Sequence, residues 1–152
     1  MTTAKREPSI APICGNYFVD ERGILIANNN FSVSDYKRFY VIRNHRINFV
    51  RAWHGHQFES KAIICLRGSF KVGIIAIDDF SKPDKNQKIE TYILDSSKGS
   101  ILKIPPGCVN GFMNLTEDSE LLVFSDKTLE ESKSDDIRYP FDFWNIWGIT
   151  QC

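Results

Sequence analysis

All three histidines of the chain fall within one twelve-residue window, as His45, His54 and His56. His54 and His56 stand two residues apart in the segment RAWHGH (51–56), which we expect to be part of a strand. Alternation along a strand points both imidazoles to the same face. Because imidazole titrates near neutral pH and binds metals, such a pair suits an acid–base site or a metal site. Two structural histidines are the alternative, and these residues alone leave it open.

The elements that must position these histidines are short strands. Apolar runs of four to eight residues, rich in Ile, Val, Phe and Tyr, alternate with turn formers such as DERG (20–23) and PPG (105–107). About eight strands at this spacing predict an all-β antiparallel sandwich or barrel. The expected strands are residues 24–27, 38–43, 47–53, 62–66, 70–77, 89–94, 101–104 and 120–124.

The C-terminal part of the chain departs from this pattern. Residues 127–136 favour one or two exposed helical turns, and residues 138–149 carry five aromatic side chains. So much aromatic surface is a liability in water, so we expect this tail to pack against the barrel mouth or another subunit. The 152 residues are therefore interpreted as a single domain, with a core over about 18–126 and an aromatic tail at 127–152.

Composition excludes several classes of function. Nineteen basic and nineteen acidic residues balance, so neither nucleic acid nor an anionic membrane is an expected partner. Four scattered cysteines without a CxxC pair indicate neither a zinc knuckle nor a disulfide framework. No signal peptide is recognisable, and no apolar run approaches the ~20 residues of a membrane span. Reduced thiols and a cytoplasmic location are expected.

The chain resembles the cupins, small jelly-roll β-barrels, over residues 18–143. Their first motif reads HxH, four residues, Glu, six residues, Gly; their second reads Gly, five residues, Pro-x-Gly, two residues, His, three residues, Asn. The matching positions here are His54, His56, Lys61 and Gly68, then Gly99, Pro105, Gly107, Asn110 and Asn114. The resemblance implies a double-stranded β-helix, the cupin jelly-roll barrel, in which Lys61 and Asn110 replace two of the usual four metal ligands.

Those two replacements argue against a metal. A lysine ammonium that faces two imidazoles repels a divalent cation, and Asn110 offers only a weak amide oxygen. Two imidazoles alone leave an incomplete coordination shell for iron, zinc or nickel. We therefore expect no metal and no other cofactor, and a barrel that performs acid–base chemistry. A metal-dependent, dioxygenase-type cupin is disfavoured on the same grounds.

Within the cupins, the chain resembles two kinds of enzyme that act on nucleotide-linked 4-keto-6-deoxy sugars. It is similar to the dTDP-4-dehydrorhamnose 3,5-epimerases at residues 18–23, at Arg51-x-x-His54 and at residues 104–112. It is similar to the dTDP-4-keto-6-deoxyglucose 3,4-ketoisomerases at residues 37–40, 51–56 and 63–69. The resemblance implies a nucleotide-diphosphate sugar as ligand, dTDP being the usual nucleotide, a homodimer, and a place in surface polysaccharide synthesis such as that of lipopolysaccharide O-antigen.

Both reactions begin with the same step. The C4 ketone acidifies the hydrogen on C3, and we expect His54 to remove that proton. Lys61 is the expected stabiliser of the enolate, as a cation held where negative charge develops on oxygen. His56 is the candidate second proton carrier, and Tyr40 is another. Return of the proton to the opposite face of C3 gives epimerisation, whereas migration of the ketone to C3 gives the 3-keto isomer.

Arginines suit the bidentate binding of a pyrophosphate, and Arg22 and Arg51 are the candidates. For Arg22, a local ion pair within the DERG turn is the alternative. Strict alternation places Arg51 on the face opposite to His54, so a bulge is needed to bring it into the same site. Asn110 is expected to hydrogen-bond the sugar, although an asparagine at a turn is the simpler alternative.

Two positions depart from the epimerase pattern, and a third has only an approximate match. Asn110 stands where those enzymes have the histidine of an HGF segment. The tyrosine that those enzymes use as an acid would fall near Val123 and Phe124, where no tyrosine stands. Asp142 is the best match for the aspartate that supports the catalytic histidine, and Asp136 is a second candidate. We therefore predict a cofactor-free epimerase at C3, with action at both C3 and C5 less favoured. The alternatives are a 3,4-ketoisomerase and a non-catalytic sugar-binding cupin.

Overall fold

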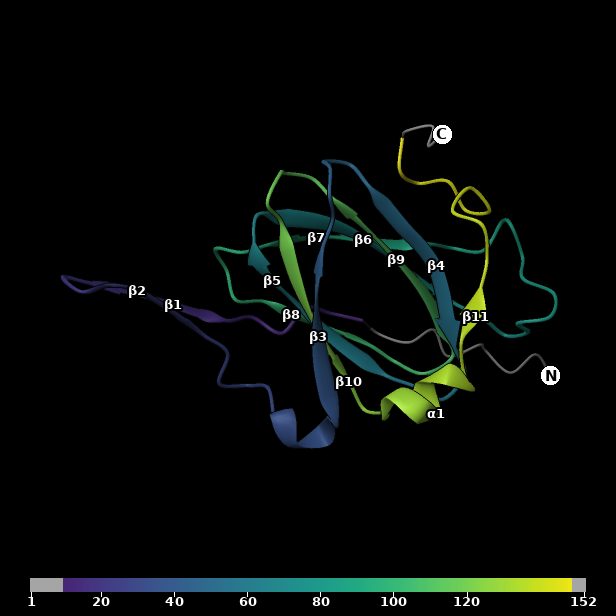
Figure 1. Cartoon of the computed structure of the whole chain (residues 1–152), viewed down its shortest axis with the longest axis horizontal. Helices are drawn as coiled ribbons and strands as arrows, with labels where there is room; N and C mark the ends of the chain where they lie inside the picture. The colour runs from purple at the N-terminus through teal and green to yellow at the C-terminus, as the bar shows by residue number, and fades with distance from the viewer. Residues whose placement is uncertain (1–9, 149–152) are drawn as a thin grey trace, which may run out of the picture.

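Residues 10–148, the part of the chain that the computed structural model describes, form eleven strands that pair antiparallel in three sheets. A four-stranded sheet has the order β3 (Arg38–Arg43), β10 (Glu120–Ser125), β5 (Lys61–Arg67) and β8 (Ile101–Ile104). A five-stranded sheet has the order β11 (Ile137–Arg138), β4 (Val50–His56), β9 (Cys108–Asn114), β6 (Ser69–Ala76) and β7 (Glu90–Asp95). These two sheets face each other and confirm the jelly-roll barrel (Figure 1).

The barrel interior is filled by alternate residues of both sheets, as period-two alternation requires. The four-stranded sheet contributes Ile63, Leu102 and Val123, and the five-stranded sheet contributes Val72 and other apolar side chains to the same buried cluster. Partly buried Tyr40 and Ile42 of β3 pack against this cluster. Beside β3 and β4, polar and charged side chains also face the interior.

A bulge in β4 changes which of its residues face the interior. Arg51 pairs with Phe112 and His54 pairs with Asn110, so three steps along β4 match two steps along β9. One extra residue therefore lies between Arg51 and His54, and both side chains face the interior. This is the bulge that the interpretation of Arg51 required.

The aromatic tail packs on the outer face of the five-stranded sheet and not at the barrel mouth. Trp144 and Trp147 are buried there against Trp53, which is 1% exposed. The Trp53 backbone exchanges hydrogen bonds with that of Tyr139, and its indole donates to the carbonyls of Phe141 and Trp144. The tail thus covers the back of the strand that carries the two histidines, within the same chain.

The sequence interpretation missed three strands, β1 (Asn16–Asp20), β9 and the two-residue β11. Strand β4 lies three residues later than the expected 47–53. All seven residues of β9 are buried, because the tail covers the face that would otherwise show polar residues. The expected helical turns are confirmed as α1 (Leu129–Lys133), which a capping box at Thr128 begins; a 3₁₀ turn, η1 (Val33–Asp35), precedes β3.

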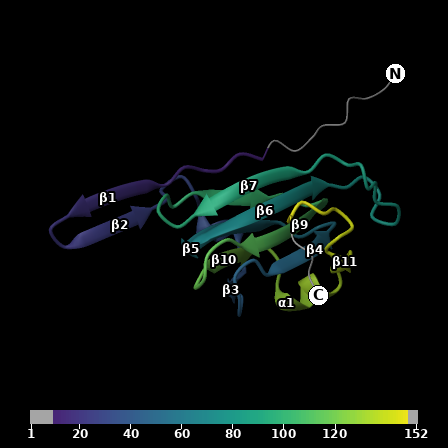
Figure 2. The ribbon, with the colours of Figure 1, turned by 90° about the horizontal axis from the view of Figure 1, so that it is seen from above.

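Strands β1 and β2 (Gly23–Ala27) form a hairpin that projects from the barrel in both views (Figures 1 and 2). We call residues 16–27 the arm. Apolar side chains on both of its strands are exposed, and isolated two-stranded hairpins are marginally stable in water. The exposed side chains are Tyr17, Phe18, Val19, Ile24, Leu25 and Ile26. Elsewhere, none of the helices between residues 10 and 148 has the length and hydropathy to cross a membrane.

We predict that Trp144→Ala lowers the free energy of unfolding by about 3–5 kcal/mol, because it empties a fully packed aromatic site. Urea denaturation followed by circular dichroism measures the change. The matched control is Ile93→Ala, since Ile93 is 60% exposed and its loss should cost less than about 0.5 kcal/mol. Equal effects of the two substitutions would contradict a tail that stabilises the sheet.

Candidate active site

A cavity of about 550 Å³ opens at the seam between β3 and β4, where the two sheets are not hydrogen-bonded to each other. The edge strand of the four-stranded sheet, β3, forms one side. β4 and β9 form the other, and α1 closes one end. Six of the eight residues proposed from sequence line this cavity: Tyr40, Arg51, His54, His56, Lys61 and Asn110.

Arg51 is held in place by an asparagine pair. Its Nε donates to the side-chain oxygen of Asn44 at 2.7 Å, and the Asn44 amide donates to the side-chain oxygen of Asn114 at 2.9 Å. Asn114 is 1% exposed and ties the β3–β4 loop to β9 through further backbone hydrogen bonds. The guanidinium is therefore oriented before any ligand binds.

His54 is neutral at physiological pH. Burial, with the charges of Lys61 and Arg138, lowers its pKa from 6.5 to about 4, and Asp136 opposes this shift. Neutral imidazole is the form that accepts a proton. Asp136, the second sequence candidate for the acidic partner of the catalytic histidine, lines the cavity and acts on His54 through its charge.

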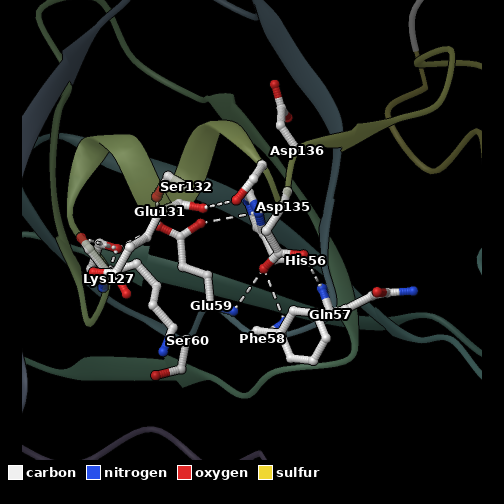
Figure 3. Close-up of polar contacts among 12 residues, drawn as sticks. His56, Gln57, Phe58, Glu59, Ser60, Lys127, Glu131, Ser132, Asp135 and Asp136 are labelled. Atoms are coloured by element: carbon white, nitrogen blue, oxygen red, sulfur yellow. Dashed lines mark hydrogen bonds and ion pairs between the residues drawn. The ribbon is translucent and has the colours of Figure 1, made fainter.

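His56 is more tightly held. Its Nδ1 lies 2.6 Å from the carbonyl oxygen of Asp135 and 3.0 Å from Oε2 of Glu59. Its Nε2 is buried and has no hydrogen-bond partner within residues 10–148 (Figure 3). Burial first, and then the charge of Lys61, lower the pKa of His56, whereas Glu59 raises it. His56 therefore presents one free ring nitrogen.

The turn between β4 and β5 is organised by Asp135, which follows α1. Its carboxylate accepts the backbone N–H groups of Gln57, Phe58 and Glu59 at 2.8–2.9 Å. Burial opposes the charge of Asp135, but these three hydrogen bonds outweigh it and lower the pKa of the carboxyl. The sequence gives no local sign of this contact, which spans more than seventy residues.

The cavity is strongly basic although the chain is neutral overall. Two acidic side chains, Glu59 and Asp136, line it, against six basic ones. Such a concentration of positive charge in a partly enclosed space favours a ligand with several negative charges. The basic residues are Arg38, Arg43, Arg51, Lys61, Lys133 and Arg138, of which only Arg51 and Lys61 were expected from the sequence.

Asn110 is fully buried on β9, opposite His54, and neither end of its amide has a hydrogen-bond partner among residues 10–148. A buried amide without partners costs free energy, so this arrangement favours a ligand that supplies both a donor and an acceptor. Asn110 lies within a strand, which removes the alternative of a turn residue.

The side chains around the two imidazoles do not fit the metal ion that many cupins hold. Lys61 is 7% exposed, and its charge acts on both imidazoles. A cation in that position repels a divalent metal. Within residues 10–148, no three His, Cys, Asp or Glu side chains are grouped closely enough to bind one. Two imidazoles beside a buried ammonium group suit proton transfer better than metal binding.

Two residues expected in the site lie outside it. Arg22 is at the tip of the arm and pairs with Asp20 at 2.5 Å, the local ion pair that was its alternative. Asp142 is an exposed residue of the tail on the outer face of the sheet. The acidic groups that reach the histidines are Glu59, Asp135 and Asp136 instead. Of these, Asp136 was the second sequence candidate. Glu59 and Asp135 were missed, because one lies in a turn and the other in the α1–β11 connection, outside the motifs.

Comparisons with known proteins agree with this geometry. A model of the FdtA family, described as WxcM-like, C-terminal, matches residues 14–147. The chain is 29% identical over 95 residues to the probable low-salt glycan biosynthesis epimerase Agl13 of Haloferax volcanii, a match that covers 61% of this chain. The match spans 60% of the length of that curated relative.

Solved structures share the fold. One is a mutant of the 3,4-ketoisomerase QdtA from Thermoanaerobacterium thermosaccharolyticum in complex with TDP-4-keto-6-deoxyglucose, with a TM-score of 0.67 and 24% identity, covering 90% of this chain and 91% of that one. Another is the dTDP-4-dehydrorhamnose 3,5-epimerase from Bacillus anthracis with TDP and PPi bound, with a TM-score of 0.77 and 17% identity, covering 94% and 87%. Both kinds of enzyme named by the sequence resemblance therefore recur among the structural neighbours.

The low pKa of His54 predicts how stability depends on pH. At a pH between about 4 and 6.5 the unfolded chain binds a proton at His54 that the folded chain does not. The contribution of His54 to the free energy of unfolding is therefore fully present above pH 6.5. It is lost as the pH falls towards 4, by up to about 1.4 kcal/mol per pH unit. Urea titrations at several pH values measure this slope.

The slope should weaken in His54→Asn and persist in His45→Asn, because His45 is exposed on the β3–β4 loop. A slope that is the same in all three proteins would mean that the imidazole of His54 is not desolvated as described.

Proposed function

The chain belongs to the FdtA family (WxcM-like, C-terminal), and from this premise we propose that it is a cofactor-free epimerase at C3 of a nucleotide-linked 4-keto-6-deoxy sugar. The observation that carries the proposal is the meeting of His54, Lys61 and Asn110 in one basic cavity. A base, a buried cation and an unpaired amide converge where a keto sugar would be deprotonated. The product would supply glycan synthesis.

The chemistry follows from the charges of the three groups. Neutral His54 takes the C3 proton, and the electron pair moves to the C4 oxygen as an enolate. Lys61 forms no ion pair with any residue from 10 to 148, so its ammonium is available to that oxygen. Desolvation strengthens this attraction, and Asn110 supplies the donor and acceptor that hold the sugar hydroxyls.

The second proton transfer decides the product. Tyr40 lines the cavity from β3, in the sheet opposite to that of His54, so it can return a proton to the other face of C3. This route gives the epimer. His56 lies on the same strand and the same side as His54. If a proton moves from the C3 hydroxyl to the C4 oxygen and one of the two imidazoles then delivers a proton to carbon C4, the product is the 3-keto isomer instead. The side-by-side imidazoles therefore favour a 3,4-ketoisomerase as the second candidate.

The basic residues suit the nucleotide diphosphate. Arg51 is oriented by Asn44 towards the cavity, and Arg43 lines it nearby on β3. Guanidinium groups bind a pyrophosphate with paired hydrogen bonds. The dTDP nucleotide is proposed from the family resemblance, as are a cytoplasmic location and a role in surface polysaccharide synthesis. A sugar-binding protein without catalysis would need neither the base nor the buried cation.

We propose further that two copies of the chain associate through the arm, as the resemblance implies. Both strands of the arm expose large apolar side chains, Phe18 and Leu25 among them, and association would bury them. Arg22 lies at the tip of the arm, away from the cavity of its own chain. It can bind the pyrophosphate only in the cavity of the partner.

Proton NMR in deuterated water tests the reaction with dTDP-4-keto-6-deoxyglucose. We expect loss of the C3 hydrogen signal and a new sugar spin system, unchanged after dialysis against a chelator. His54→Asn should slow the exchange by about 10²–10⁴-fold, because the base is lost. His45→Asn, the matched control, should exchange at the wild-type rate.

The same spectra separate the alternatives. A retained C4 ketone with inverted coupling at C3 identifies the epimerase, and a C3 ketone identifies the ketoisomerase. Exchange at C5 as fast as at C3 would contradict a C3 enzyme. Binding of the nucleotide sugars tested, dTDP-, UDP- and GDP-linked, without any exchange would overturn the catalytic proposal in favour of a binding protein.

The oligomeric state is tested by Phe18→Asp with light scattering. A charge in the apolar face of the arm should raise the dissociation constant of the dimer by at least about tenfold, the effect of losing a central interface aromatic. Phe58→Asp is the control, since Phe58 is 67% exposed but lies on the β4–β5 turn. A wild-type chain that is monomeric, or a Phe18→Asp variant that stays dimeric, would contradict the proposed interface.

A further inference from the structure

Glu59 is a buried carboxylate that the reaction described above does not use. It is 2% exposed, in the turn between β4 and β5. Its Oε1 accepts hydrogen bonds from the hydroxyls of Ser125 and Ser132, the latter at 2.6 Å, and it pairs with the guanidinium of Arg38 at 3.4 Å. Three donors from β10, α1 and β3 thus fix one carboxylate oxygen.

The other oxygen of Glu59 faces His56. Oε2 lies at ion-pair distance, 3.0 Å, from Nδ1 of the imidazole and accepts no hydrogen bond from residues 10–148 (Figure 3). The carbonyl oxygen of Asp135 lies 2.6 Å from the same nitrogen. Both neighbours of Nδ1 can only accept, because a carbonyl and an ionised carboxylate have no proton to donate. Nδ1 must therefore carry the hydrogen in both protonation states of the ring.

We infer that Glu59 is a positioning residue that holds His56 as the Nδ1–H tautomer, so that Nε2 is the atom that accepts and returns protons in the cavity. The role of Nε2 rests on the proposed function in its second form, the 3,4-ketoisomerase, in which His56 carries a proton, whereas the tautomer does not. A carboxylate behind an imidazole also stabilises the imidazolium that forms when Nε2 takes a proton. Glu59 thus takes the part that the sequence resemblance assigned to Asp142, but towards the other histidine.

The charges around His56 show why such support is needed. Lys61 on β5 opposes a positive charge on the ring, as does burial, and His54 on the same strand is neutral. Glu59 and Asp135 are the anionic groups that favour the charge. The carboxylate of Asp135 accepts hydrogen bonds from three backbone N–H groups, so Glu59 is the carboxylate in direct contact with the ring.

The substitution Glu59→Gln changes the contact with Nδ1 of His56 in a specific way. Ser125, Ser132 and Arg38 donate to Oε1, so the amide oxygen of the glutamine should occupy that position. Its NH₂ group then stands at the position of Oε2, against Nδ1–H of His56. Two donors cannot share that contact, so only the Asp135 carbonyl would still favour Nδ1–H, and the Nε2–H tautomer of His56 should gain population. Removal of the carboxylate should also lower the pKa of His56 further.

The test is nitrogen NMR of the histidine rings in ¹⁵N-histidine protein, with signals assigned through His45→Asn and His56→Asn. In the wild type we expect Nδ1 of His56 protonated and Nε2 free at neutral pH. In Glu59→Gln we expect the Nε2–H tautomer to gain population. Glu117→Gln is the matched control, an exposed glutamate on the β9–β10 turn, and should leave the spectrum unchanged. An Nε2–H tautomer in the wild type, or an unchanged ring in Glu59→Gln, overturns the inference.

A second measurement needs no variant, in case Glu59→Gln does not fold. In protein with ¹³C-labelled glutamate carboxyls, the Glu59 signal should move at the pH where His56 titrates, because the two groups are in contact. A Glu59 signal that does not respond to His56 overturns the inference.

Kinetics then separate this inference from the proposed function. Glu59→Gln should lower kcat by about 10²-fold or more, as a misplaced imidazole tautomer does, with KM changed much less. Wild-type turnover with an unaffected kcat in Glu59→Gln would refute the positioning role and leave the enzyme intact. Absence of turnover in the wild type, together with the expected tautomer, would refute the proposed function and leave the tautomer assignment standing.

Discussion

The single extra residue in β4 is the constraint on which the site depends. Without it, Arg51 and His54 would point to opposite sides of the sheet. With it, the strand turns Trp53 outward and directs Arg51, His54 and His56 into the barrel. A bulge weakens the pairing of β4 with β9 locally, and backbone hydrogen bonds along the other edge of β4 compensate for this loss. The Trp53 backbone pairs with Tyr139, and its ring is enclosed by the aromatic tail.

Charge is the second constraint. A neutral chain places six basic side chains around one cavity, so their mutual repulsion must be offset locally or by a ligand. Arg38 is offset by Glu59, and Arg138 by Asp136. Lys61 and Arg51 have no acidic partner in the described part of the chain, which leaves them for the ligand. Of these two, Lys61 is the cation whose charge acts on both imidazoles.

Much of this arrangement was accessible from the sequence, because it is encoded locally. The strand pattern predicted the barrel, and the HGH spacing placed two imidazoles on one face. β9 was missed because the tail buries the face that would have shown alternation. Glu59 was missed because its burial depends on Arg38, Ser125 and Ser132, which are 21, 66 and 73 residues away. Asp142 was expected in the site from its place in a motif, whereas the tail carries it to the far side of the sheet.

The contact between the tail and β4 also determines when the site can form during synthesis. Residues 139–147 hydrogen-bond to and pack against β4, which lies about ninety residues earlier in the chain. Asp135, which follows α1, hydrogen-bonds to the turn after β4. A nascent chain that has emerged only as far as β10 has the two histidines but lacks their support. Contacts of such long sequence separation form late and slow the folding of β proteins. The strand that carries the two histidines is therefore translated early and among the last elements to be completed.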